Sequence, residues 1–247
     1  SSAASDVYKR QDLFEYKRSQ RGNGLAVTGF RGSQNQTIIF QNRSGNTPVV
    51  EVADDSFCNS STEEAILTEG IASIGRNAFS GCDKLHQVVL PISIEEINDS
   101  AFENCRNLKS VSLPGALKTI GNAAFKGTGL RTIAIPESVF WIGNGVVADC
   151  QLLEHVTIPS NMDKIPEHMF EGCINLKKVE LHERLNEIGE RAFFGCSSLD
   201  FIVIPDSVKK IGKNAFTNTD KQFIMQSSFG SYAEEYARKN KFKYQLV

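Results

Sequence analysis

The sequence predicts a solenoid of stacked repeats, with a parallel β-sheet on its concave face, short helical turns and loops on its convex side, and a cap at each end. Three observations predict it: phenylalanine recurs at a nearly fixed interval, a short strand pattern recurs at the same interval, and an Ile-Gly step joins the two in most repeats. One repeat, or rung, cannot bury its apolar residues alone, so neighbouring rungs must stack to form a continuous core.

Most rungs carry a phenylalanine in the same place. Successive members of this ladder lie 22 or 23 residues apart, and Val147 fills the one position without a phenylalanine. A period of roughly 20 to 29 residues is typical of a leucine-rich-repeat solenoid. Because burying a phenylalanine contributes about 1.5–3 kcal/mol, we interpret the ladder as a stability feature and not as a ligand site. The ladder consists of Phe57, Phe79, Phe102, Phe125, Val147, Phe170, Phe193 and Phe216.

A strand opens each rung. Between Leu85 and Pro91 apolar residues alternate, as in a strand with one buried face, and proline ends the strand because it has no N–H to donate. A step such as Ile120-Gly121 then turns the chain toward the short helical turn that holds the ladder residue. Outward strand positions would line the concave face, which suits a protein or glycan partner, although a solvated face without function would have the same composition. Four of them are candidate partner-binding residues: Arg131, His155, Lys178 and Phe201.

Five of the six cysteines follow the ladder residue by three positions. Thr128 and Thr219 take this position in two other rungs, which indicates a small buried residue and favours inert thiols. Disulfides between adjacent rungs are the alternative, which an oxidising compartment would favour. Cys58 lies outside this series and is expected to be an exposed thiol. The five are Cys82, Cys105, Cys150, Cys173 and Cys196.

The rung of Val147 departs most from the repeat. It carries Phe140-Trp141 where other rungs carry polar pairs such as Lys118-Thr119, and Trp141 is the only tryptophan. Tryptophan is enriched in binding hot spots, so one hypothesis is that Phe140 and Trp141 form an exposed binding patch. The alternative is that a neighbouring aromatic side chain folds inward and fills the space left by Val147, because protein interiors tolerate voids poorly.

No pattern of catalytic or metal-binding residues is found. The sequence has no Cys-x-x-Cys pair, no glycine-rich phosphate loop and no His-Glu-x-x-His, and its four histidines occupy different positions in different rungs. We therefore predict no enzymatic activity, no cofactor and no metal. A formal net charge of −2 gives no reason to expect nucleic acid. No apolar run approaches the roughly 20 residues that span a bilayer, so membrane insertion is not expected either.

Segments on both sides of the array are predicted to cap its end rungs, which would otherwise expose apolar faces. We place the N-terminal cap with a first partial repeat at residues 12–57, the repeat array at 58–218, and a C-terminal cap of strand, short helix and strand at 219–247. Within the first cap, Gly22-Asn23-Gly24 fits a hairpin turn.

The pattern Ile-Pro-x-Ser-Val-x-x-Ile-Gly-x-x-Ala-Phe, nearly whole from Ile204 to Phe216, resembles the BspA-like leucine-rich repeats of bacterial surface proteins. The resemblance extends from Asp12 to Val247. It implies a non-enzymatic binding protein, secreted or on the cell surface, that adheres to a protein of a host, matrix or neighbouring cell, or to a glycan. Because a fold does not fix a function, two alternatives stay open: a structural spacer or assembly element of a larger surface protein, and an intracellular scaffold.

Residues Ser1 to Gln11 stand apart from the repeats. They resemble the in-frame translation of a transposase adapter used to prepare sequencing libraries, so we exclude them from the fold prediction as a segment that is not native. The natural chain is then expected to be truncated before Asp12, with its signal sequence lost.

Overall fold

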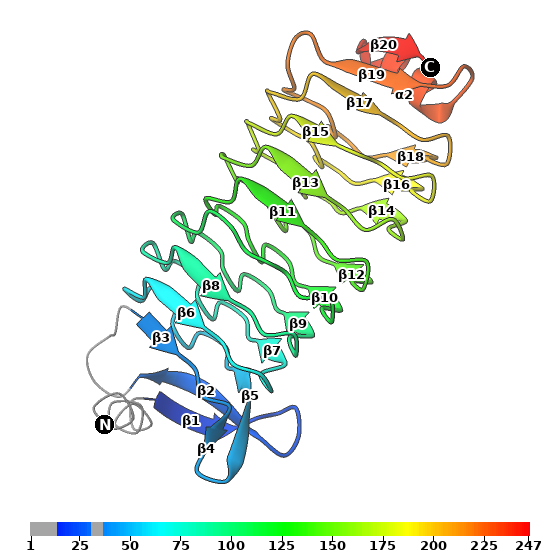
Figure 1. The fold of residues 1–247 in the computed structure, drawn as a ribbon. Coiled ribbons are helices and arrows are strands. Elements are labelled where there is room, and N and C mark those ends of the chain that lie inside the picture. The colour runs from blue at the N-terminus through cyan, green and yellow to red at the C-terminus, as the bar shows by residue number, and fades with distance from the viewer. Residues whose placement is uncertain (1–13, 31–36) are drawn as a thin grey trace.

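The computed structural model describes residues 14–30 and 37–247 as a solenoid in which most turns pass through two short strands (Figure 1). The strands of successive turns lie side by side in two rows, and most neighbours within a row pair in parallel; β8 and β11, β15 and β17, and β12 and β14 belong to separate sheets. The predicted leucine-rich-repeat solenoid with parallel sheets is thereby confirmed. The segment Ser1 to Gln11, with its expected adapter origin, lies outside the described residues.

The first row contains strands that the alternating pattern predicts. In β13 the side chain of Val156 is buried and its two neighbours are exposed. The strands are in register, with Thr132 opposite His155 and His155 opposite Lys178. The row consists of β3 (Thr37–Ile39), β6 (Glu64–Ile66), β8 (Gln87–Val89), β11 (Thr132–Ala134), β13 (His155–Thr157), β15 (Lys178–Val179), β17 (Phe201–Val203) and β19 (Ile224–Ser227).

One predicted strand of this row is missing. Residues 108–113 form no strand, so β8 and β11 belong to separate sheets. The following turn is one residue shorter than in most rungs, and Gly129 lies so close to the carbonyl of Arg106 that a Cβ atom there would meet its oxygen at 2.2 Å. The turn after Phe57 is equally short, yet the strands β3 and β6 on its two sides are paired, so turn length alone does not account for the interruption.

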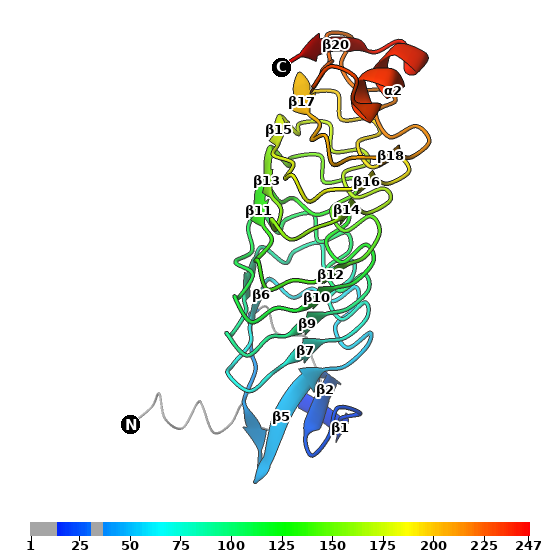
Figure 2. The ribbon, with the colours of Figure 1, turned by 90° about the vertical axis from the view of Figure 1, so that its right-hand side faces the viewer.

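The second row follows the Ile-Gly steps, where the sequence analysis predicts only a turn. Figure 2 shows its strands one above another along the solenoid. Most of these strands are two residues long, which is too short to give an alternating pattern in the sequence. The row consists of β5 (Thr47–Val52), β7 (Ser73–Ile74), β9 (Glu96–Ile97), β10 (Thr119–Ile120), β12 (Trp141–Ile142), β14 (Lys164–Ile165), β16 (Glu187–Ile188) and β18 (Lys210–Ile211).

The predicted short helical turns take the form of consecutive hydrogen-bonded turns. Backbone N–H groups donate three residues back, as from Ala78 to the carbonyl of Gly75 (3.2 Å). Each turn contains a residue in the left-handed conformation, such as Asn77 (φ 53°) or Arg191 (φ 53°), and this residue interrupts any α-helical repeat.

The ladder residues form the centre of the core, and each is at most 2% exposed. Their rings stack from rung to rung, with centroids 5.4 Å apart between Phe79 and Phe102 and between Phe102 and Phe125. Val147 interrupts the stack. In the position before the ladder residue, where most rungs have alanine, its own rung has Val146 and the next has Met169, and both are fully buried. These larger side chains supply volume beside Val147.

Both ends of the array are covered by additional elements. At the N-terminal end, β1 (Phe14–Arg18) pairs antiparallel with β2 (Leu25–Phe30), β4 (Arg43–Ser44) pairs antiparallel with β5, and Phe14 stacks on Phe40 at 5.6 Å. At the C-terminal end, helix α2 (Tyr232–Asn240) and strand β20 (Lys243–Leu246) follow β19. The hydroxyl of Ser231 caps α2 by accepting from the backbone N–H of Glu234 (3.2 Å). No helix in residues 14–30 and 37–247 is long and apolar enough to cross a membrane.

Candidate binding site

The second row of strands is interrupted at one place, between the rungs of Val147 and Phe170. Strand β12 ends one sheet and β14 begins another, and the two are not hydrogen-bonded to each other. On the first row the same two rungs remain paired, because β11 and β13 are in register through three residues. The rungs also rejoin after the interruption, where Gly145 donates to the carbonyl of Glu167 (2.9 Å).

Proline accounts for one of the hydrogen bonds missing at the interruption. In other rungs, the residue after the second-row strand donates its N–H to the preceding rung, as from Gly121 to Ile97 (2.7 Å) and from Gly143 to Ile120 (2.9 Å). The equivalent residue opposite Ile142 is Pro166, which has no N–H. The carbonyl of Ile142 is therefore left without the partner that the repeat would provide.

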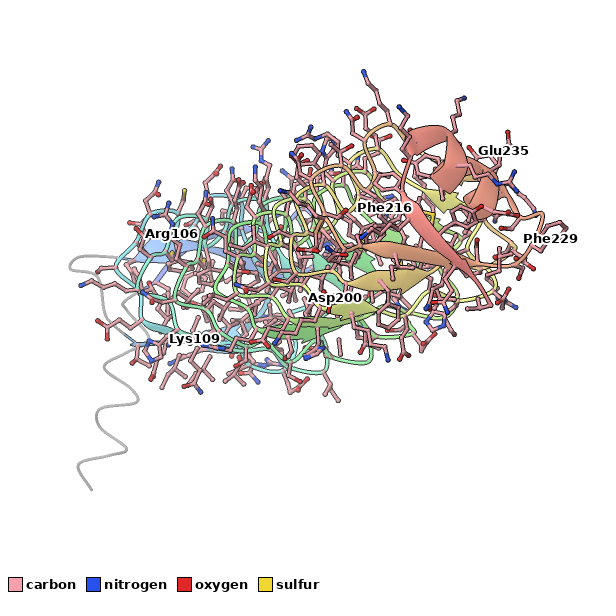
Figure 3. All side chains as sticks on the ribbon, turned by 90° about the horizontal axis from the view of Figure 1, so that it is seen from above. Arg106, Lys109, Asp200, Phe216, Phe229 and Glu235 are labelled. Atoms are coloured by element: carbon pink, nitrogen blue, oxygen red, sulfur yellow. The ribbon has the colours of Figure 1, made fainter. Side chains whose placement is uncertain are left out.

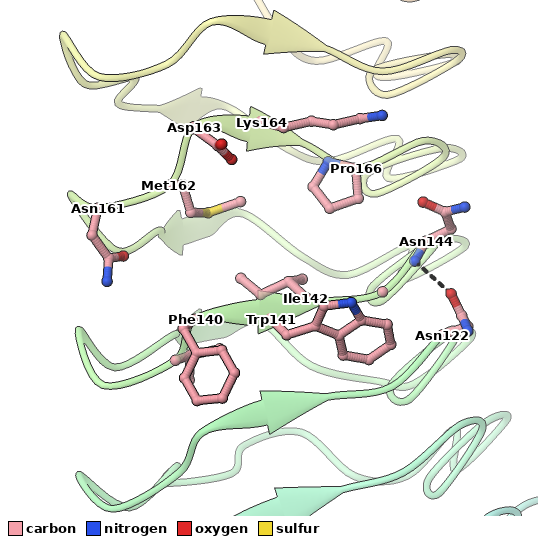
Figure 4. A pocket seen from close by; sticks show the side chains of 12 residues that line it. Asn122, Phe140, Trp141, Ile142, Asn144, Asn161, Met162, Asp163, Lys164 and Pro166 are labelled. Carbon is pink, nitrogen blue, oxygen red and sulfur yellow. Dashed lines mark hydrogen bonds between the residues drawn. The ribbon is translucent and has the colours of Figure 1, made fainter.

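A cleft of about 550 Å³, which we call the Trp141 cleft, lies at this interruption. Figure 4 shows Met162 and Pro166 pointing toward the space from one side, and the indole of Trp141 extending from the other side toward Asn122 and Asn144. Ile142 is partly exposed here, whereas the isoleucines in its position in other rungs are buried. The cleft is lined by Asn122, Val139, Phe140, Trp141, Ile142, Gly143, Asn144, Asn161, Met162, Asp163, Lys164 and Pro166.

Phe140 and Trp141 are 73% and 46% exposed, so in the structure neither fills the space beside Val147. The alternative of an inward-folded aromatic is therefore not what the structure shows. Val146 and Met169, which are larger than the alanine of other rungs, are fully buried next to Val147: Val146 precedes it in the chain, and the Val147 N–H donates to the carbonyl of Met169 (3.3 Å). Whether the exposed pair binds a partner stays a hypothesis.

A series of side-chain hydrogen bonds ends at the cleft. The carboxylate of Asp99 accepts from the backbone N–H of Asn122 (2.6 Å), and the Asn122 amide oxygen accepts from the N–H of Asn144 (2.8 Å; Figure 4). The side-chain amide of Asn144 has no such partner among the residues that the structure describes. It is therefore available to a ligand.

Charge in the cleft is confined to two neighbouring residues. Lys164 pairs with Glu187, with 3.0 Å between the Lys164 Nζ and Glu187 Oε1 atoms, and Lys210 shares the same carboxylate oxygen at 3.0 Å. The carboxylate of Asp163 makes no ion pair within the described part of the chain. Asp163 is thus a lining carboxylate without a cationic partner, and the two charged residues of the lining have opposite signs.

A leucine-rich-repeat region of BspA type, in six copies, matches residues 28–154 and 95–222, which together exceed half of the chain. The chain belongs to the BspA-type leucine-rich-repeat family. Proteins of this family and fold are typically binding modules without catalytic activity.

Solved structures of bacterial leucine-rich-repeat proteins are similar to this BspA-type chain. One from Bacteroides ovatus ATCC 8483 is 27% identical with a TM-score of 0.78, and the match covers 95% of this chain and 66% of that one, so this chain spans less than two thirds of that protein. The leucine-rich-repeat protein of T. pallidum is 26% identical with a TM-score of 0.70, covering 94% and 95% of the two chains. No curated protein matches the sequence.

The other candidate residues of this BspA-type protein lie on the first row of strands, on a different surface from the Trp141 cleft. Arg131 lies 3.4 Å from Glu154, and Lys178 lies 2.6 Å from Glu180. His155 and Lys178 line a depression of about 210 Å³, and Phe201 is 42% exposed. The six candidate residues therefore form two surfaces instead of one site.

The structure adds cleft residues that sequence reasoning missed, namely Ile142, Asn144, Met162, Asp163 and Pro166. One signal could have found them, because Pro166 replaces glycine in the Ile-Gly step of its rung. Within the described residues, no group of three or more histidine, cysteine, aspartate or glutamate side chains is placed to hold a metal ion.

The ladder cysteines are buried thiols that donate hydrogen bonds. Each Sγ atom lies 3.0–3.2 Å from the carbonyl oxygen of the preceding rung's ladder residue, as from Cys82 to Phe57 (3.0 Å) and from Cys196 to Phe170 (3.2 Å). Burial raises the pKa of the Cys150 thiol to about 11. Cys58 is partly exposed. Its pKa is also raised, mainly by slight burial and to a smaller extent by the nearby Asp55 carboxylate.

An ion pair links the turns of the Phe170 and Phe193 rungs. Arg191 donates to the Glu171 carboxylate from Nε (3.1 Å) and from Nη2, and this holds the pKa of Glu171 below its ordinary value of 4.5. The Arg191 guanidinium also lies over the ring of Phe194, 3.6 Å from its centroid. The pair therefore joins neighbouring rungs outside the core.

Proposed function

We propose that this protein is a non-enzymatic adhesion or protein-interaction module of a bacterium, secreted or on the cell surface. It attaches to a host, matrix or neighbouring-cell partner through exposed surfaces of the solenoid. The Trp141 cleft carries the proposal, because it combines a break in the repeat with exposed aromatic side chains and unpartnered polar groups. Such a combination is typical of binding sites. The BspA-type family supports the placement outside the cell, because the sequence resembles repeats of bacterial surface proteins.

The first row of strands offers a second surface for the same function. Its outward residues differ from rung to rung, so Arg131, His155, Lys178 and Phe201 present a non-repeating set of charged, polar and aromatic groups. Extended surfaces of this kind are what solenoids use to bind partners. The two surfaces can be tested separately because they share no residue.

The test measures attachment of purified protein to immobilised matrix glycoproteins, mucin and fixed epithelial cells. We compare the natural chain with Phe140→Ala/Trp141→Ala, which removes the aromatic pair of the cleft, and with Lys178→Ala/Phe201→Ala on the first row. The matched control is Phe229→Ala, since Phe229 is 82% exposed, projects from the C-terminal end of the molecule (Figure 3), and is part of neither surface.

The proposal is supported if the unmodified chain attaches and if attachment is at least about tenfold weaker for one double variant but unchanged for the control. No attachment to any surface would contradict adhesion and favour a structural spacer. Equal attachment by all variants would show that neither surface binds. Localisation is tested separately: an export signal encoded upstream of the Asp12 codon in the source genome supports it, and a complete reading frame without one favours an intracellular scaffold.

A further inference from the structure

We infer that the Trp141 cleft binds a neutral sugar ring of a glycan, stacked on the indole of Trp141. This inference rests on the proposed binding function and names the class of ligand. Four features of the cleft carry it: the apolar surface, the unpartnered polar groups, the charge, and the limited length of the open strand edge.

The apolar surface is of the kind that a sugar ring can cover. Trp141 is 46% exposed, and Ile142, Met162 and Pro166 add aliphatic surface around it. A pyranose ring presents C–H groups on its faces and hydroxyls around its edge. Stacking on the indole would cover the C–H face and leave the hydroxyls free for polar contacts.

The unpartnered polar groups of the cleft can form hydrogen bonds with sugar hydroxyls. The cleft offers acceptors in the carbonyl of Ile142 and the carboxylate of Asp163, and both donor and acceptor in the amide of Asn144. A sugar hydroxyl both donates and accepts, which lets one ring satisfy groups on both rungs.

Charge favours a neutral glycan. Lys164 shares the carboxylate of Glu187 with Lys210, so the lining holds one charge of each sign and no excess of positive charge that would attract an acidic ligand. A ligand bearing carboxylate or sulfate groups would therefore gain no net attraction, and it would meet the unpaired carboxylate of Asp163.

The open strand edge is too short for an extended peptide. A peptide that adds a strand needs several consecutive backbone partners. Here β12 has two residues, and the rungs are joined again at Gly145 and Glu167. One ring fits this local opening, whereas a strand would require the rungs to separate further.

The experiment uses the fluorescence of Trp141, because it is the only tryptophan in the chain and reports directly on the cleft. Purified protein is titrated with neutral hexasaccharides built of glucose, mannose, galactose, xylose or N-acetylglucosamine, and with hyaluronan and heparin hexasaccharides as acidic probes. We expect a saturable emission change with at least one neutral probe and at least about tenfold weaker binding of the acidic ones.

Variants locate the binding by calorimetry. Trp141→Ala should weaken binding of the neutral probe at least about tenfold, and Trp141→Phe should weaken it less because an aromatic ring remains. Phe229→Ala should leave the binding unchanged. Asn144→Ala should also weaken it, while leaving the far-ultraviolet circular dichroism unchanged. No emission change with any neutral probe up to about 10 mM overturns the inference, and so does binding that Trp141→Ala leaves intact.

Failure of this inference can be told apart from failure of the proposed function. Periodate oxidation destroys sugar rings on the surfaces used for attachment. Attachment that survives oxidation but is lost in Phe140→Ala/Trp141→Ala would retain adhesion and replace the glycan with a protein partner. Absence of attachment to untreated surfaces, together with saturable binding of a free hexasaccharide, would retain the glycan site and reject adhesion.

Discussion

Restoring phenylalanine to the one ladder position that lacks it should destabilise the protein. The change Val147→Phe completes the sequence pattern, and a view based on the pattern alone predicts a gain from renewed stacking. The structure predicts a loss, because Val146 and Met169 already fill the space beside Val147 and both are fully buried. Adding a ring to a filled core typically costs about 1–3 kcal/mol.

The same reasoning gives the magnitude for a compensated variant. Val146→Ala and Met169→Ala each open a cavity and should cost about 1.6 and 2–5 kcal/mol by themselves. Combined with Val147→Phe, they recreate the Ala-Phe pair of the other rungs and nearly conserve volume, which limits the cost to about 1.5 kcal/mol. The loss of unfolding free energy in the triple variant should therefore be smaller, by about 3 kcal/mol or more, than the sum of the losses in the three single variants.

The assay is urea unfolding followed by circular dichroism and by the fluorescence of Trp141, which lies in the same rung. Coincidence of the two curves is required, because repeat arrays can unfold in parts. Val89→Phe is the matched control: it adds the same ring at an exposed valine and should change stability by less than about 0.5 kcal/mol. A Val147→Phe variant more stable than the natural chain, or a triple variant no better than the sum, would refute the packing argument.

Three further predictions concern the surface. Iodoacetamide should modify all six cysteines in urea but only Cys58 in the native protein, and that reaction should be slow because the pKa of Cys58 is raised. Mass spectrometry that finds ladder thiols modified in the native state would contradict their burial. Pro166→Gly restores an N–H opposite Ile142, so acrylamide quenching of Trp141 fluorescence should fall. The free energy of unfolding should change little, because the hydrogen bond gained (about 0.5–1.5 kcal/mol) and the added entropy of the unfolded chain (about 0.4–1 kcal/mol) nearly cancel. Unchanged quenching would mean that proline does not hold the cleft open. Because the pKa of Glu171 is lowered in the folded state, its pair with Arg191 stabilises the protein above about pH 4.5, and this stabilisation is lost as the pH falls through the lowered pKa. Glu171→Gln should therefore cost less than about 1 kcal/mol at pH 7 and should reduce the loss of stability at acid pH. An unchanged loss of stability at acid pH would exclude the pair as its source.

The spacing of the phenylalanines was sufficient to predict the repeat, because burial of the ladder is a local requirement that every rung must meet. The first-row strands followed from alternation around residues such as Val156, whose burial agrees with the pattern. The second row did not follow, because a strand as short as Thr119–Ile120 owes its conformation to pairing with neighbouring rungs and not to its own sequence.

The cleft could be predicted only in part. Trp141 stood out by its rarity, and its exposure agrees with one of the two alternatives. The opening beside it depends on which backbone atom faces Pro166, and that register becomes visible only when two rungs are stacked. Separation of Trp141 from Arg131 onto different surfaces has the same origin, because within one rung Arg131 directly precedes the first-row strand β11, whereas Trp141 belongs to the second-row strand β12.

The cysteine ladder means that the fold is indifferent to the redox state of its surroundings. Each of the five thiols uses its proton in a hydrogen bond to the preceding rung, so the core assembles without an oxidant. Their burial also withholds them from disulfide exchange, so an oxidant outside the cell would find only Cys58 within reach. The same rungs can therefore form on either side of a membrane, and the thiols do not reveal the compartment in which the protein works.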